Sequence, residues 1–191
     1  MFNKDSIISD MRKAMGHVER ARPIIERLLN GGKLYTVEGS DDELCVMLDT
    51  TCGTDYMQVY KTKGLAWGVT SRMQEIDTAK TPRPFNSFTV RKERASGAKT
   101  EWEKRRLAIK CGGIYPYLTM QGFVDKNNGE IMSLAIARTK DIMDYIDSGK
   151  AKTRHTGRDQ KGQAEFFVVY WKNFKDEGYD IKIYEKQEVW Y

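Results

Sequence analysis

The sequence predicts a mixed α/β (α+β) fold, with a central mixed sheet that begins as an antiparallel three-strand meander and is flanked by helices. Three observations predict this class. An amphipathic helical pattern opens the chain, short apolar runs separated by turn residues follow, and a second helical pattern precedes further strands. Such elements bury the most apolar surface when the helices pack on one sheet. With 191 residues, 40% of them hydrophobic, the chain is long enough to enclose a core.

The opening helix is predicted over residues 5–30. Val18, Ala21 and Ile25 belong to a series of apolar residues spaced three or four positions apart, and this spacing gives a helix one buried face. Pro23 predicts either a kink in this helix or the start of a second helix.

Three short apolar runs after the helix predict the meander. They are Leu44–Leu48, Tyr56–Tyr60 and Leu65–Met73. Turn-forming residues at 51–54 and 61–64 separate the runs, and short connections of this kind join antiparallel neighbours.

Two further helices and five further strands are predicted beyond the meander. The strongest signal is Asn128-Gly129, because an Asn-Gly pair readily adopts the positive φ of a tight hairpin turn. Thr100 followed by Glu103 is a capping box, which marks the start of a helix. In chain order, the elements are a strand at Phe88–Arg91, a helix at Lys99–Lys110, strands at Tyr117–Val124 and Ile131–Ala137, a helix at Thr139–Ile146 capped by Thr139, and strands at Phe166–Trp171 and Ile181–Tyr184.

The chain is predicted to divide into a core domain over 1–147, a polar basic loop over 148–163, and a C-terminal strand extension over 164–191 that packs on the core. The loop contains glycines and almost no apolar residue, which is typical of a mobile segment. Its Lys and Arg side chains could close over bound nucleic acid, or could simply keep a linker soluble. Edge strands in the extension could join two copies as a homodimer.

Charge and composition exclude several classes of protein. Lys and Arg number 32 against 27 Asp and Glu, so the formal net charge is +5, which allows a polyanionic partner. No apolar stretch reaches the roughly 18 residues of a membrane helix, and the N-terminus lacks a secretory signal, so we expect a cytoplasmic protein without a membrane partner. The cysteines and histidines do not have the spacing of a zinc site. Any metal would be a hard cation held by carboxylates.

Two carboxylates, Asp49 and Asp55, flank the tight turn between the first two runs. This placement can direct both at one cation, although Asp also commonly serves as a turn former. In the third run, strand alternation puts Thr70, Arg72 and Gln74 on one face. These polar groups could orient a phosphate and its attacking water, or could form the solvent side of a half-buried strand.

A basic segment extends from 91 to 106, with seven Lys and Arg against three Glu. Clustered cations of this kind contact nucleic-acid phosphates. The alternative is a solvated helix with a Glu101–Arg105 pair, and Trp102 could either stack on a base or pack in the core. The candidate nucleic-acid-binding residues are Arg91, Arg94, Lys99, Lys104 and Arg105.

Together these segments resemble the PD-(D/E)XK nuclease superfamily over residues 16–124. The resemblance rests on Gly53-Thr54-Asp55-Tyr56 opening a strand, a turn at Lys63-Gly64, the strand Trp67–Gln74, and the order helix–strand–strand–strand–helix–strand. In that superfamily the first motif acid and an acid on the next strand hold magnesium. A lysine one residue beyond the second acid helps to activate water.

By this resemblance, Asp55 is the first motif acid, Asp49 is a candidate second ligand, and Gln74 stands where some members carry glutamine in place of the second acid. Arg72-Met73-Gln74 departs from the family's Glu-x-Lys pattern, because the basic and amide groups come in reversed order.

The resemblance implies a nuclease, specifically an endonuclease-type phosphodiester hydrolase, that uses Mg²⁺ or Mn²⁺ held by Asp55 and Asp49. Arg72 and Gln74 would place the phosphate and the water, and DNA rather than RNA is the expected nucleic acid. The alternative is a catalytically inactive, nuclease-like module that binds nucleic acid or inhibits a protein, of the kind a virus or mobile element could carry.

Overall fold

The computed structural model describes residues 4–80, 84–94, 97–156 and 164–186. The helices are α1 (Lys4–Leu28), α2 (Glu43–Met47), α3 (Glu101–Cys111), α4 (Thr139–Asp147) and α5 (Trp171–Asp176), with a π-helical turn at Leu48–Cys52 and a 3₁₀ turn at Lys61–Lys63. The strands are β1 (Lys33–Thr36), β2 (Tyr56–Tyr60), β3 (Leu65–Ile76), β4 (Ser87–Arg94), β5 (Leu118–Asp125), β6 (Ile131–Arg138), β7 (Lys152–Thr156), β8 (Ala164–Tyr170) and β9 (Ile181–Glu185).

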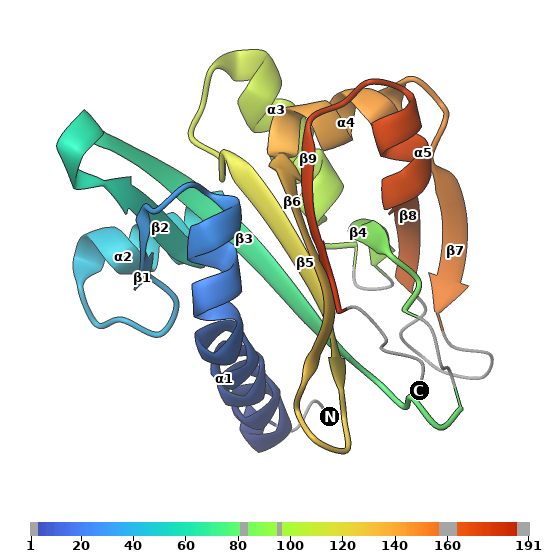
Figure 1. Cartoon of the computed structure of the whole chain (residues 1–191). Helices are drawn as coiled ribbons and strands as arrows, with labels where there is room; N and C mark the ends of the chain where they lie inside the picture. Colours follow the sequence, from blue (N-terminus) through green and yellow to red (C-terminus); the bar gives the residue numbers. More distant parts are fainter. Residues whose placement is uncertain (1–3, 81–83, 95–96, 157–163, 187–191) are drawn as a thin grey trace.

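These strands form two sheets (Figure 1). The main sheet has the strand order β1-β2-β3-β5-β6-β9, and the small sheet has the order β4-β8-β7. Pairing in the main sheet is antiparallel except between β3 and β5, which run parallel. The predicted fold class, a mixed sheet begun by an antiparallel three-strand meander and flanked by helices, is therefore confirmed.

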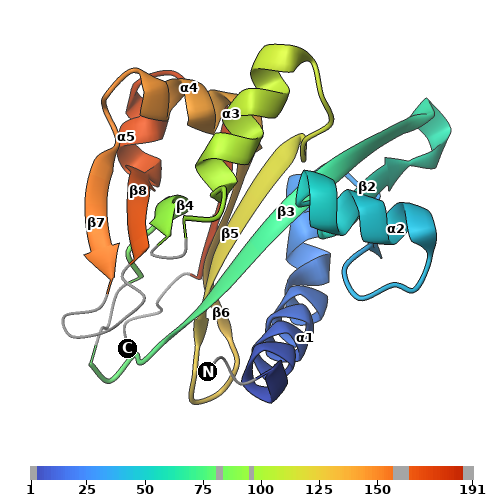
Figure 2. The same cartoon turned by 180° about the vertical axis from the view of Figure 1, so that it is seen from behind.

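Both faces of the main sheet are covered. Since parallel neighbours need a long crossover, the chain returns from β3 to β5 through β4 and α3, and the two views show these elements on the face opposite α1 (Figures 1 and 2). All eight residues of β5 are buried, as expected for a strand covered on both sides. None of the described helices is long and apolar enough to cross a bilayer.

The two faces carry separate apolar cores. Under α1, Val18 and Ile25 pack with Val69 and Met120 of the sheet. On the other face, a second cluster gathers around Phe88, Phe123, Trp171 and Phe174 and joins the small sheet to α4 and α5. Alternation along β3 and β5 therefore decides which side chains meet α1 and which meet α3 and β4.

The first strand of the meander lies elsewhere than the sequence predicts. Leu44–Leu48, expected to be a strand, instead forms α2 and the start of the π-helical turn. Asp42 caps this helix by accepting the Cys45 N–H at 3.2 Å. Leu44 is 60% exposed, so the apolar run does not contribute to a sheet core. The strand that pairs with β2 is β1, a four-residue segment with one buried residue.

The polar basic loop predicted over 148–163 is wrong in its first half. Lys152–Thr156 forms β7, whose residues pair with β8 in antiparallel register, while 157–163, with Arg158 and Lys161, lies outside the described residues.

A further correction concerns the homodimer edge, because β8 is the central strand of the small sheet and only β9 of the two predicted strands lies at an edge.

Predicted turns and caps are mostly confirmed. The side chain of Thr100 accepts the Glu103 N–H, and Glu103 accepts the Thr100 N–H at 2.7 Å, which completes the capping box of α3. The hairpin turn lies between β5 and β6 as expected, with Gly129 at φ 71°. The predicted cap Thr139 is wrong: α4 is preceded by Arg138, and the Thr139 hydroxyl instead hydrogen-bonds that of Thr119 at 2.9 Å.

Candidate functional site

A cavity of about 260 Å³ is lined by residues of β3, β4, β5 and α3. Figure 2 shows α3 and β4 on the face of the main sheet opposite α1. We call this cavity the polar cavity, because most of its lining side chains are charged or hydroxylated. They come from the turn before β2, from β3, β4 and β5, and from α3 and the segment that precedes it. The lining residues are Asp49, Thr50, Cys52, Gly53, Asp55, Thr70, Ser71, Arg72, Thr89, Arg91, Lys99, Glu101, Lys104, Arg105, Thr119, Met120 and Gln121.

Asp55 is fixed by strand register. It directly precedes β2, and because Tyr56 pairs with Val69, its side chain faces the next positions of β3. Its carboxylate accepts the Ser71 backbone N–H at 2.5 Å and the Thr70 hydroxyl at 3.3 Å. Burial raises the pKa of Asp55 to about 6, and the charge of Asp49 adds to this, while the Ser71 N–H and Arg105 oppose it.

Two more carboxylates, Asp49 and Glu38, are close enough to Asp55 for their charges to interact. Asp49, in the π-helical turn, lines the same cavity, and burial raises its pKa. Glu38 follows β1, and its pKa is raised to about 7 by burial and then by the charges of Asp55 and Asp49. Because of burial and mutual repulsion, ionising Asp49, Asp55 and Glu38 all together costs free energy.

The opposite wall is built around Glu101 at the start of α3. Its carboxylate lies 2.6 Å from the Arg105 guanidinium and 3.3 Å from that of Arg72, and it accepts the Arg91 backbone N–H at 3.4 Å. Burial works to raise the pKa of Glu101, but the three arginines together hold it below its usual value. Arg105 is only 5% exposed, and burial lowers its pKa despite this pairing.

The structure brings most predicted site residues together. The polar cavity contains Asp49, Asp55 and Arg72, and four of the five basic candidates, namely Arg91, Lys99, Lys104 and Arg105. The side chain of the fifth, Arg94, lies outside the described part of the chain. Gln74 does not line this cavity: it is exposed and lines a neighbouring one, which Arg72 also lines.

The two structural alternatives for α3 are resolved by its packing. The Glu101–Arg105 pair forms as the helical spacing predicts, but Arg105 is buried and Glu101 is only partly exposed, so the pair does not lie on a solvated helix face. Trp102 packs against Phe167, with ring centroids 5.4 Å apart, and Arg106 lies over it. Trp102 therefore contributes to the core rather than to the cavity.

The sequence did not reveal that Glu101 joins Arg72, Arg91 and Arg105. It also did not point to Thr89 and Gln121 as cavity residues. Gln121 is 1% exposed, and its side-chain oxygen accepts both the backbone N–H and the hydroxyl of Thr89, at 2.9 and 3.1 Å. The available signal was the pair Thr119 and Gln121 in an otherwise apolar strand, because polar residues at alternate positions share one face.

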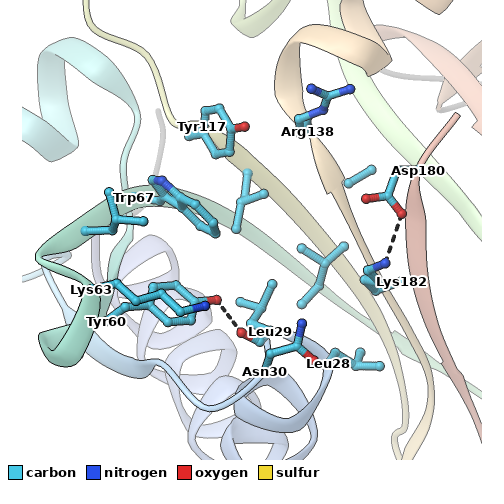
Figure 3. Close-up of a pocket in the computed structure, with 14 residues that line it drawn as sticks. Leu28, Leu29, Asn30, Tyr60, Lys63, Trp67, Tyr117, Arg138, Asp180 and Lys182 are labelled. Atoms are coloured by element: carbon cyan, nitrogen blue, oxygen red, sulfur yellow. Dashed lines mark hydrogen bonds and ion pairs between the residues drawn. The ribbon is translucent and has the colours of Figure 1, made fainter.

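A second cavity, of about 310 Å³, lies on the α1 side of the sheet, beyond the end of that helix (Figure 3). Tyr60, Trp67 and Tyr117 form one side of it, with successive ring centroids 5.1 and 5.2 Å apart. Arg138 and Lys182 lie across from them, and each forms an ion pair with a nearby aspartate. The lining of this cavity is therefore more apolar than that of the polar cavity.

We expect Asp55→Asn to stabilise the fold above pH 6. Since the folded-state pKa of Asp55 is raised from near 4 to about 6, the folded protein holds this proton more tightly than the unfolded chain. Stability therefore falls as pH rises from about 4 to about 6, and the penalty persists at higher pH. Removing the charge should add about 1–3 kcal/mol to the free energy of unfolding at pH 8, and the gain should shrink towards pH 4, as measured by urea denaturation.

The control for this variant is Glu75→Gln, for which the sign is opposite. Hydrogen bonds from Lys13 and His17 lower the pKa of Glu75, so its charged form stabilises the folded protein above about pH 4.5, and the neutral variant should be less stable at pH 8. A loss of stability at pH 8 in Asp55→Asn would contradict this account of the cavity.

Glu101→Gln should destabilise the protein by about 3 kcal/mol, because it leaves the buried Arg105 without a charged partner. Asp176→Asn is the matched control: Lys172 and Asp176 have the same four-residue spacing at 2.8 Å, but both side chains are exposed, so the change should stay below about 1 kcal/mol. Thermal or urea denaturation measures both. Similar losses in the two variants would show that Glu101 is not the organising group of this wall.

Comparison with family models, with curated proteins and with solved structures found no match for the chain.

Proposed function

We propose that the protein binds nucleic acid by seating backbone phosphates in the polar cavity. Five cationic side chains and three carboxylates line it. Glu101 is engaged by Arg72 and Arg105, while Lys99 and Lys104 are exposed at the rim. Cations that converge from β3, β4 and α3 suit a phosphate, whose oxygens accept several charge-assisted hydrogen bonds at once.

The observation that carries this proposal lies at the floor of the cavity. The oxygen of the Gln121 side chain is fixed by its two bonds to Thr89, so the amide nitrogen is the free end. This nitrogen is buried and has no hydrogen-bond partner within the described residues. A buried donor without a partner costs about 1–3 kcal/mol. A phosphate oxygen would satisfy this donor if the side chains around it shifted enough to expose it to the cavity.

The relationship to PD-(D/E)XK nucleases remains part of this proposal. In support, α1, the β1–β2–β3 meander, α3 and β5 follow the order of elements on which the resemblance rests, with α2 and the π-helical turn inserted between β1 and β2, and β4 inserted before α3. Three consecutive β3 residues line the cavity with Asp55, namely Thr70, Ser71 and Arg72, and strand alternation puts Thr70 and Arg72 on the same face. Under this proposal, Thr70 and Arg72 would take the places of the family's second acid and lysine, which are likewise separated by one residue. This departure favours binding over hydrolysis.

Cleavage is the second candidate function, and one observation favours it. Asp49 and Asp55 line one cavity with cationic side chains, and Mg²⁺ commonly binds through one or two carboxylates together with waters and substrate phosphates. Within the described residues, no group of three or more His, Cys, Asp or Glu side chains gathers to hold a metal. A cation here would need water and phosphate to complete its coordination, and it would neutralise the phosphate and lower the pKa of a bound water.

Binding is tested with the double variant Lys99→Ala, Lys104→Ala and a fluorescently labelled single-stranded DNA of twelve nucleotides. Each phosphate contact releases counterions from the DNA, so a variant with two fewer contacts releases fewer of them on binding. The slope of the log of the binding constant against log salt should therefore fall by about 1.5 in magnitude, and affinity near 0.1 M salt should drop at least about tenfold. Fluorescence anisotropy at several salt concentrations measures both quantities.

The matched control is Lys33→Ala, Lys61→Ala, which removes the same charge from β1 and from the turn after β2. This variant should keep the slope of the unmodified protein. If the two double variants lose affinity equally, the protein responds to net charge alone and the cavity is not the binding site.

Cleavage is tested by incubating the unmodified protein and Asp55→Asn with labelled DNA and RNA in Mg²⁺ or Mn²⁺. The nuclease candidate requires products from the unmodified protein, no products from the variant, and similar nucleic-acid affinity of both, because Asp55 would act through the cation. Intact substrate with the unmodified protein in both metals would remove this candidate and leave the binding proposal standing.

A further inference from the structure

A third cavity adjoins the polar cavity, between β3 and the small sheet. We call it the aromatic cavity; its volume is about 430 Å³. Arg72 and Thr89 line both cavities, so the two share a wall. The residues that line the aromatic cavity are Arg72, Gln74, Phe85, Ser87, Thr89, Phe123, Arg154, His155, Phe166, Val168 and Tyr170.

Strand pairing explains why aromatic and cationic side chains meet there. In the small sheet, Arg91 and Arg154 flank Phe166, since both pair with it across the strands, and Ser87 pairs with Tyr170. The alternate residues of β4 and β8 turn the other way and join the core cluster of Phe88 and Trp171. The face towards β3 therefore keeps a polar and aromatic surface that the core does not use.

Arginine side chains lie close to aromatic rings on this face. The guanidinium groups of Arg72 and Arg91 each lie 5.4 Å from the centre of the Phe166 ring, and that of Arg154 lies 5.2 Å from the Phe85 ring. Phe85 is 45% exposed. Nucleic-acid bases stack on aromatic rings and on arginine planes alike, and proteins that bind single strands combine such surfaces with a cationic groove.

We propose that the aromatic cavity takes an unpaired base of a single-stranded nucleic acid whose phosphate occupies the polar cavity, an inference that rests on the proposed function. The shared residue Arg72 reaches both groups of one bound strand. Gln74, Ser87 and His155 provide donors and acceptors for the edge of the base. A base within a duplex is stacked on both faces and paired along its edge, so it cannot enter a lined cavity without leaving the helix.

The experiment compares three labelled probes of equal length: single-stranded DNA, the same strand with abasic sites throughout, and a blunt duplex. The unmodified protein should bind the base-bearing strand about tenfold more tightly than the abasic strand or the duplex. Phe85→Ala should reduce this preference several-fold while leaving affinity for the abasic strand unchanged. The matched control is Tyr117→Ala, an aromatic residue of similar exposure in the cavity beyond α1, which should change neither affinity.

The possible failures are distinguishable. Equal affinity for the base-bearing and abasic strands would overturn the base site and leave phosphate binding intact. Failure to bind any of the probes would overturn the proposed function itself. Preference for the duplex, with a rise in fluorescence of a 2-aminopurine placed in it, would show that the base is flipped from paired DNA, and would overturn single-strand recognition. Loss of abasic binding in Phe85→Ala, with Tyr117→Ala unaffected, would mean that Phe85 supports the polar cavity rather than a base.

Discussion

The carboxylate of Glu101 is the group on which this end of the molecule depends. It engages a side chain of β3, a backbone N–H of β4 and a side chain of its own helix. Arg105 is almost completely buried, and a buried guanidinium requires a charged partner at close range. α3 can therefore dock only where Glu101 also reaches β3 and β4. That docking carries Lys99, just before the helix, and Lys104, on its second turn, to the rim of the polar cavity.

Alternation along two neighbouring strands separates structural from chemical side chains. On β3, Val69 packs under α1 while Arg72 faces α3, and on β5 Met120 joins the α1 core while Gln121 faces the cavity. Because β3 and β5 run parallel and in register, with Arg72 opposite Gln121, their polar positions coincide on one face. The small sheet repeats the arrangement, with one face in the core and the other towards β3. Both cavities with polar linings thus lie on the same side of the main sheet.

Signals confined to neighbouring residues predicted the fold well. The capping box at Thr100, the Asn-Gly turn and the apolar spacing of α1 each depend on contacts within a few residues, which a sequence displays directly. β1 and β7 could not be found in this way. Each is a short strand with little apolar character of its own, and each exists because a stronger strand, β2 or β8, offers it backbone partners. The run at 44–48 failed for the opposite reason, since its apolar residues form an exposed helix.

The sequence predicted most of the residues that line the polar cavity, but not which β3 residue lies beside Asp55. Asp49, Asp55, Arg72 and the basic residues of α3 line one cavity, whereas Gln74 lines the neighbouring one. The difference comes from the turn at 61–64, whose length decides which β3 residue stands opposite β2. With Tyr56 paired to Val69, the side chain beside Asp55 is Thr70, and Gln74 is four residues further along the strand. No property of Gln74 itself could have revealed this.

The acids near Asp55 bear on whether the polar cavity would bind or cleave nucleic acid. Asp55 sits beside Asp49 and near Glu38, with its pKa raised to about 6, and a phosphate in the same cavity would add further negative charge. Such a set cannot remain fully ionised at low cost, so something must neutralise it. A proton on Asp55 would leave a binding module, in which Gln121 and the arginines hold the phosphate. A divalent cation shared by Asp49, Asp55 and the phosphate would place a Lewis acid on the scissile group. In the proposed function, the species that neutralises Asp49, Asp55 and the phosphate would therefore distinguish binding from cleavage.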